Sequence, residues 1–432
     1  MSPESLSRGL FFEELRMVRL RQPFIFSALA FFLITTGFAR NREKIKQLTP
    51  SAKGSTGLFN LFVADSLRQG EFSLGLSLTH FNREPGDLDF TLFPVSLTVG
   101  LHDRVEFFVS WEAHRQVNAD AIRVDKIASG DPIVPARLSN SAGTVAFFNG
   151  APFLDVGSGK GSGELWTGSK INLLSELQGD PLGLAIQPVI KLPLSDGRSR
   201  LLQGLTNGAL EAGFDLILSK ELPRGGTFTA NYGYLFVGSS QDVKLQNRLN
   251  YGVGSAIPIG TGNIRTIVEL VGSLFVGEGE TGANPKSPLD LYLGLQISTS
   301  KWMSLSAAYN INLHSINPDL PKFGIQATDR SGWFFQMAFH RKINRAPTIR
   351  CDPEHSIVRE GDSATVRVQI TDSDDSFLSL TWRASSGHIS QHGTTVVFDS
   401  TGLQAGKYTV SAEVGDGERT ASCSTEITVE KR

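Results

Sequence analysis

Apolar and polar residues alternate along much of the chain between residues 70 and 342. Near its start, Phe72, Leu74, Leu76 and Leu78 fall on one face of an extended segment, and the serine, glycine and threonine residues between them fall on the other. A period of two predicts a β-strand with one apolar and one polar face. Because the pattern returns many times, we expect a protein built mainly of strands.

Twelve segments carry this alternation. They span residues 70–81, 88–100, 104–115, 162–174, 182–194, 208–220, 227–237, 247–259, 264–276, 288–299, 302–313 and 332–342. Most are longer than the strands of globular proteins and match the length of a tilted strand that crosses a bilayer. We therefore predict an all-β fold in which residues 70–343 form a twelve-stranded antiparallel transmembrane β-barrel.

The connections between the segments support a barrel. Those after strands two, four, six, eight and ten are short, whereas those after strands three, five, seven, nine and eleven are long and polar, the largest spanning residues 116–161. Bacterial outer-membrane barrels have short periplasmic turns and long outer loops. Trp111, Tyr251, Trp302, Tyr309 and Trp333 stand near strand ends, as interfacial aromatic residues do. A soluble all-β protein, whose strands also alternate, is the alternative.

Ionisable residues stand within these strands, always on the polar face. The candidates for lining the lumen are Glu106, Glu112, Lys170, Lys191, Glu211, Asp215, Arg265 and Glu269. Charged rings in a pore orient solutes and bias ion selectivity. Opposite charges can instead pair with each other and brace the wall. Both alternatives stay open, and both need a polar interior.

The N-terminus carries an apolar run from Phe24 to Ala39 that follows basic residues and ends in small ones. It is shorter than a membrane-spanning helix and resembles a secretory signal peptide, so we expect residues 1–39 to be removed, with Met17 as the alternative start. An uncleaved anchor helix is the other interpretation. Residues 40–69 would form an N-terminal periplasmic segment, in which residues 45–67 could enter the pore or bind at its periplasmic mouth.

Residues 344–432 have a different pattern of apolar and polar positions. Shorter alternating runs cover residues 365–370, 378–382, 395–398, 408–414 and 425–429, and they are separated by turns rich in Gly and Asp. Such spacing indicates a small β-sandwich. Because the last barrel strand ends on the side of the short turns, we expect this domain in the periplasm.

Sequence motifs in this region resemble a known type of domain. Asn-Arg-Ala-Pro-Thr-Ile at 344–349, Thr-Asp-Ser-Asp-Asp at 371–375, Phe-Asp-Ser-Thr-Gly-Leu at 398–403 and Val-Gly-Asp-Gly at 414–417 are similar to those of PKD-type immunoglobulin-like domains of bacterial envelope proteins. The early barrel, through Gly-Glu-Phe-Ser-Leu-Gly at 70–75 and Gly-Glu-Leu-Trp at 163–166, resembles outer-membrane proteins of the transporter or meta-pathway phenol-degradation type. The resemblance implies a membrane barrel with a periplasmic accessory domain.

The two cysteines, Cys351 and Cys423, stand in the first and the last predicted strand of the sandwich. In an oxidising compartment a disulfide there would contribute about 4 kcal/mol by the loop-entropy model. Two free buried thiols are the alternative. Asp372, Asp374 and Asp375 supply oxygen ligands of the kind that calcium prefers, although aspartate also favours turns without a metal.

Composition and motifs narrow the function. The formal net charge is −2, and no extended basic cluster offers a surface for nucleic acid. No nucleophile elbow and no His-Glu-x-x-His motif is present in the sequence, so we expect no enzyme and no cofactor. A third interpretation is an outer-membrane hydrolase that uses a histidine of the lumen or rim. The leading prediction is a passive outer-membrane channel for small solutes. The alternative is a structural or assembly protein whose barrel anchors the sandwich for a periplasmic protein or glycan partner.

Overall fold

The computed structural model describes residues 49–83, 88–119, 137–140, 143–146, 151–154, 158–176, 180–222, 225–260, 263–277, 287–300, 302–313, 330–341, 343–372, 378–417 and 419–432. The expected signal peptide, residues 1–39, and Met17 lie outside these ranges. Within them, no helix is both long and apolar enough to cross a membrane.

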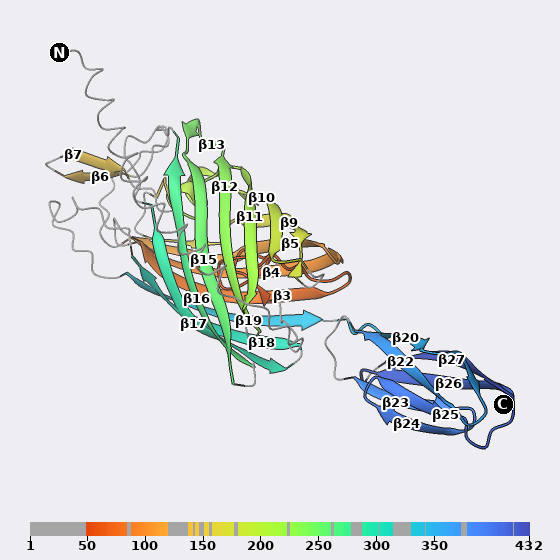
Figure 1. The fold of residues 1–432 in the computed structure, drawn as a ribbon. Helices are drawn as coiled ribbons and strands as arrows, with labels where there is room; N and C mark the ends of the chain where they lie inside the picture. Colours follow the sequence, from red (N-terminus) through yellow and green to blue (C-terminus); the bar gives the residue numbers. More distant parts are fainter. Residues whose placement is uncertain are drawn as a thin grey trace, which may run out of the picture.

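Twelve long antiparallel strands form one closed sheet (Figure 1). They are β3 (Phe72–Arg83), β4 (Leu88–His102), β5 (Val105–Ala119), β9 (Leu165–Leu174), β10 (Gly183–Leu192), β11 (Glu211–Leu222), β12 (Gly226–Val237), β15 (Asn247–Ile259), β16 (Ile264–Val276), β17 (Leu289–Ser300), β18 (Met303–Asn312) and β19 (Ser331–Arg341). The predicted twelve-stranded antiparallel barrel is confirmed, and each predicted segment overlaps one of these strands.

The barrel closes between its first and last strands. Each strand pairs with its neighbour in the chain, and β19 pairs with β3 through ten register positions from Gly332↔Phe81 to Arg341↔Phe72. The short strand β8 (Ser158–Gly161) pairs with the end of β5 beside β9, so it continues the β9 edge. Closure leaves no row of unpaired backbone groups, which is the condition for spanning hydrocarbon with strands.

The two faces of the barrel wall differ as the alternation predicts. Large apolar side chains are exposed on the outside, among them Phe107 (40% exposed), Phe214 (43%) and Leu293 (43%). Ionisable residues on the opposite face are fully buried, as Glu106 and Lys170 show at 0%. A soluble barrel would reverse this arrangement, because its apolar residues gain free energy only when water is removed from them.

Phe108 interrupts the alternation in sequence, and the structure gives the reason. It faces inward with 0% exposure and packs with Val189, Leu235 and Trp166 inside the barrel. The interior is therefore a mixture of polar contacts and small apolar clusters.

The C-terminal residues form two four-stranded sheets beyond the end of β19 (Figure 1). One sheet contains β20 (Thr348–Pro353), β22 (Ser363–Thr371), β25 (Thr395–Asp399) and β24 (His388–His392). The other contains β21 (Ile357–Arg359), β27 (Thr420–Glu430), β26 (Gly406–Gly415) and β23 (Ser379–Ala384). Inward residues of both sheets share one apolar core that includes Val366, Trp382, Phe398 and Val410.

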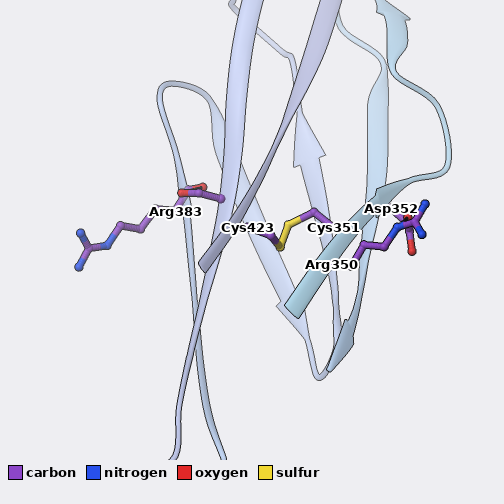
Figure 2. Close-up of a disulfide and its surroundings, with 6 residues drawn as sticks. Arg350, Cys351, Asp352, Arg383 and Cys423 are labelled. Carbon is purple, nitrogen blue, oxygen red and sulfur yellow. Dashed lines mark hydrogen bonds and ion pairs between the residues drawn. A yellow bond between two sulfur atoms is a disulfide. The ribbon is translucent and has the colours of Figure 1, made fainter. Parts of the chain in front are cut away.

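The expected disulfide is present. Figure 2 shows the bond between Cys351 on β20 and Cys423 on β27, so it links one sheet to the other across 72 residues of sequence. The Cα atoms of the two cysteines are 5.7 Å apart, within the usual range for a disulfide. The nearby Arg350 and Asp352 form an exposed ion pair in which Nε lies 3.0 Å from Oδ1.

The remaining elements are short. β1 (Thr49–Pro50) and β2 (Thr56–Gly57) form a small hairpin near the start of the described chain. β6 (Arg137–Asn140) with β7 (Gly143–Ala146), β13 (Ser239–Ser240) with β14 (Val243–Lys244), and helix α2 (Arg198–Leu202) belong to the long connections. Around α2, Leu201 packs with Phe153, Ala209 and Leu245, so several long connections meet in one apolar cluster.

Candidate functional site: the barrel lumen

Residues 49–67 lie inside the barrel and contact its wall on many sides; we call this segment the plug. The expected periplasmic location of residues 40–69 is therefore wrong for residues 49–67, which occupy the lumen, the possibility left open for residues 45–67. Backbone hydrogen bonds hold the plug in a compact shape, such as Ser51 N–H to Ser55 O at 2.9 Å and Val63 N–H to Thr56 O at 3.1 Å. Its only strands among the described residues, β1 and β2, pair with each other and not with the wall. Side chains of the wall therefore hold the plug.

The first wall contact is made by Glu106 of β5. Its carboxylate accepts hydrogen bonds from Ser55 Oγ at 2.8 Å, Thr56 N–H at 2.9 Å and Leu67 N–H at 3.0 Å, so it holds the middle and the C-terminal end of the plug. Lys170 Nζ lies 3.0 Å from Glu106 Oε1 and also donates to Val63 O at 2.8 Å. Removing one partner of a fully buried ion pair typically costs about 3–5 kcal/mol, because the other charge stays buried.

The second contact is made by Glu269 of β16. Its carboxylate accepts three consecutive plug amides: Phe59 N–H at 2.8 Å, Asn60 N–H at 3.0 Å and Leu61 N–H at 3.2 Å. The Asn60 side chain adds a fourth hydrogen bond at 3.1 Å. The two oxygens of one side chain thus satisfy three successive backbone amides and a side-chain amide of the plug.

The third contact comes from neutral side chains of β11 and β12. Asn231 accepts Phe62 N–H at 2.7 Å and donates to Phe62 O at 3.0 Å, which satisfies both backbone groups of that residue. Ser219 Oγ accepts Ala64 N–H at 2.9 Å. These bonds take the place of the sheet ladder that the plug lacks.

The fourth contact comes from polar side chains on several other strands. Thr98 donates to Gly54 O at 2.6 Å, Ser110 to Ala52 O at 2.9 Å and Gln336 to Pro50 O at 2.8 Å. The inward serine, threonine and glutamine residues that alternation places on the polar face thus act as donors to plug carbonyls.

Apolar contacts add to the polar ones. Phe59 packs against Phe334 with the rings tilted and their centroids 5.2 Å apart, within a cluster that also holds Leu58, Val63 and Tyr292. Phe62 and Ala64 pack against Ala185 and Ile217 of the opposite wall. The plug is therefore packed on both sides and occupies the lumen.

Glycine residues of the wall make room for the plug. A Cβ atom on Gly294 would lie 2.7 Å from the Phe59 ring, and one on Gly75 would lie 2.8 Å from Pro50. Any larger residue at these positions would collide with the plug as it sits here.

A second group of charges lies near the long connections, and we call it the outer cluster. Lys191 Nζ is 2.7 Å from Glu164 Oε2 and 2.5 Å from Glu211 Oε1, and Arg248 also pairs with Glu211. Arg115 joins the cluster through Glu112 at 3.2 Å and Glu164 at 3.9 Å. None of the hydrogen bonds found for these carboxylates within the described chain goes to the plug.

Six of the eight lumen candidates divide between these two groups. Glu106, Lys170 and Glu269 hold the plug, whereas Glu112, Lys191 and Glu211 belong to the outer cluster. Asp215 accepts a hydrogen bond from Gln187 at 3.4 Å. Arg265 is half-buried on the same face of β16 as Glu269 and lies opposite Gln296 of β17.

Several lumen residues were not among the sequence candidates. Glu164 stands just before β9, and Arg83 of β3 pairs with Asp290 of β17 at 2.7 Å. The plug residues themselves were missed as binding partners of named wall residues. Inward glycines such as Gly75 and Gly294 are a weak signal of a filled lumen, because a Cβ atom there would also approach wall atoms, Ser96 Oγ at 2.5 Å and Ala308 Cβ at 2.6 Å.

The proposed calcium ligands stay untested. Asp372 is described, whereas Asp374 and Asp375 lie outside the described residues. In the part of the chain that the structure describes, no group of three or more His, Cys, Asp or Glu side chains is placed to hold a metal ion.

Comparison with known proteins finds similarity only among solved structures. No family model and no curated protein matches the chain. An outer-membrane channel from Pseudomonas putida F1 aligns with 64% of this chain and 98% of its own length, at 11% identity and a TM-score of 0.45. The β domain of the Bordetella autotransporter BrkA aligns with 63% and 99%, at 12% identity and 0.32. OmpT, an outer-membrane protein of Vibrio cholerae, aligns with 63% and 96%, at 10% identity and 0.29.

Proposed function

We propose that the protein is a bacterial outer-membrane channel for small polar solutes, closed by its plug in the state described here. The observation that carries this proposal is a lumen wall lined with buried ionisable residues and occupied by a segment that does not join the wall as a strand. A barrel that served only as an anchor would be stable with an apolar interior, whereas buried charges carry a desolvation cost.

The proposed channel opens when the plug leaves the lumen. Glu106, Lys170 and Glu269, which now bind the plug, would then face water together with Asp215. Charges of both signs on one wall favour the passage of hydrated polar solutes over apolar ones. We further propose that the two C-terminal sheets form an immunoglobulin-like sandwich of the PKD type in the periplasm, and that the barrel itself has no enzymatic role.

The alternative proposal is a structural or assembly protein, in which the plug never leaves. The extent of plug packing favours it, because polar and apolar contacts hold residues 49–67 on all sides described above. Under this alternative the barrel presents the C-terminal domain to a periplasmic protein or glycan.

One experiment separates the two proposals. The full chain with Ser51→Cys has a single free thiol, since both native cysteines are in the disulfide. Ser51 is 0% exposed, so a membrane-impermeant maleimide reports the departure of the plug. Planar-bilayer recordings of the same protein, with Glu269→Ala added to unseat the plug, should show solute-dependent conductance together with fast labelling. Labelling without conductance would refute the channel. Absence of both labelling and conductance would support the structural role, in which the plug never leaves.

A further inference from the structure

The plug continues into β3 through residues 68–71, which leave the lumen beside the short turn between β4 and β5. Gly70 N–H donates to Gly100 O at 2.9 Å, and Gly100 N–H donates to Glu71 O at 2.9 Å. Gln69 N–H donates to Asp103 Oδ1 at 3.1 Å. We call residues 68–71 the exit segment.

The linker to the C-terminal sheets returns to the same place. Arg345 binds Asp103 with both terminal nitrogens, Nη2 to Oδ1 at 2.7 Å and Nη1 to Oδ2 at 3.0 Å. Since Oδ1 also accepts Gln69 N–H, one carboxylate joins the linker to the exit segment.

A second carboxylate repeats this arrangement. Glu71 Oε2 accepts Arg68 N–H at 3.0 Å, within the exit segment. Its other oxygen, Oε1, accepts Ile343 N–H at 3.4 Å, from the linker. Two residues of the linker therefore share acceptors with two backbone amides of the exit segment. We call Glu71, Asp103, Ile343 and Arg345 the latch.

The exit segment fits tightly between its neighbours. A Cβ atom on Gly100 would lie 1.9 Å from Arg68 O, and one on Gly70, whose φ is +83°, would lie 2.7 Å from Ile343 Cδ1. A displacement of the linker or of the turn therefore displaces the exit segment, because there is no free space to absorb it.

The exit segment connects directly to the plug. Leu67 N–H, one residue before Arg68, donates to Glu106 Oε2 at 3.0 Å, and the same carboxylate holds Ser55 and Thr56. Asp103 of the latch is thus three residues in sequence from Glu106, the charge that holds the middle and the C-terminal end of the plug.

We propose that the C-terminal domain regulates the plug through this latch: a partner that binds the C-terminal sheets and displaces residues 343–345 frees the exit segment and favours departure of the plug. The inference rests on the proposed function, since it assigns a regulator to the same lumen. The covalent connection between the barrel and the C-terminal sheets then has a physical role, because binding to the sheets changes the position of the plug.

The test compares latch variants in the full chain that carries the Ser51→Cys reporter. Arg345→Ala and Asp103→Asn should each raise the maleimide labelling rate about threefold to tenfold, the range of an exposed bidentate ion pair with a shared amide. The double variant should add little to either single one, because both remove the same contact. The exchange Asp103→Arg with Arg345→Asp should restore the ion pair but not the acceptor for Gln69 N–H, so its rate should fall between those of the parent and the single variants.

A matched control uses an ion pair that is remote from the plug. Arg350→Ala and Asp352→Asn break an exposed pair of the same kind within β20 and should leave the labelling rate unchanged. Parental labelling rates in the latch variants would overturn the inference, as would an equal increase in the control pair.

The outcomes also distinguish this inference from the proposed function. If Glu269→Ala gives labelling and conductance while the latch variants behave as the parent, the channel stands and the latch is refuted. If the latch variants raise labelling but no variant conducts, the latch controls the plug and the channel is refuted.

Discussion

Removal of the Glu269 carboxylate is the sharpest perturbation of the plug. In Glu269→Ala, the amides of Phe59, Asn60 and Leu61 lose the acceptor that now lies 2.8–3.2 Å away. Each buried N–H without a partner costs about 1–3 kcal/mol. Taking the low end for all three, since water can enter the space left by the side chain, the seated plug loses about 3 kcal/mol.

A loss of about 3 kcal/mol corresponds to a change of roughly 100-fold in the ratio of released to seated plug. With the Ser51→Cys reporter, the maleimide labelling rate should rise by that factor when opening is fast relative to the chemical step. Glu269→Gln keeps one carbonyl acceptor and should fall between the parent and the alanine variant.

Glu112→Gln is the matched control. Its carboxylate belongs to the outer cluster, 3.2 Å from Arg115, and has no hydrogen bond to the plug within the described chain. It should label at the parental rate. If Glu269→Ala labelled no faster than Glu112→Gln, the Glu269 hydrogen bonds would not hold the plug, and the reasoning would be refuted.

Three further predictions follow from other parts of the molecule. Leu293→Arg, on the outer face near the middle of β17, should lower the free energy of unfolding in lipid vesicles by about 2–4 kcal/mol. Leu101→Arg, at the short-turn end of β4, should lower it by only about 0–1 kcal/mol. Equal losses would contradict a belt of lipid around the barrel. Joint replacement of Cys351 and Cys423 by serine should lower the stability of the C-terminal sheets by about 4 kcal/mol in urea titrations followed by Trp382 fluorescence, and an unchanged midpoint would argue against a structural disulfide. Arg345 holds the pKa of the Asp103 carboxyl well below its ordinary value of 3.8. Stabilisation by the latch is therefore complete above pH 3.8 and is lost only as the pH falls further below it. A rise in Ser51→Cys labelling already between pH 7 and pH 5, corrected for the thiolate fraction with a free thiol, would refute the role of this ion pair.

The barrel could be predicted from sequence because its pattern is local. Each lipid-facing strand must present an apolar residue at every second position, and this requirement appears within a window of ten residues. The observed strand ends differ from the predicted ones where pairing with a distant segment extends a strand. β5 runs to Ala119 because its last residues pair with β4 on one side and, at residues 115–118, with β8 of the longest connection on the other.

The filled lumen could not be predicted because its contacts are distant in sequence. Phe59 and Glu269 are 210 positions apart, and neither residue type indicates the other. The inward charges were identified as a class, but their division between the plug and the outer cluster depends on the register of non-adjacent strands. The contact between Asp103 and Arg345 is of the same kind, since it spans 242 positions.

The most direct test of the whole account is a nitroxide scan along β17 in lipid vesicles, with power saturation by oxygen and by a water-soluble nickel chelate. We predict a period of two over residues 289–297, in which labels at Leu291, Leu293 and Leu295 collide mainly with oxygen dissolved in lipid and labels between them do not. Preferential collision of the leucine positions with the nickel chelate, or a uniform profile along the strand, would contradict a barrel whose apolar face meets lipid.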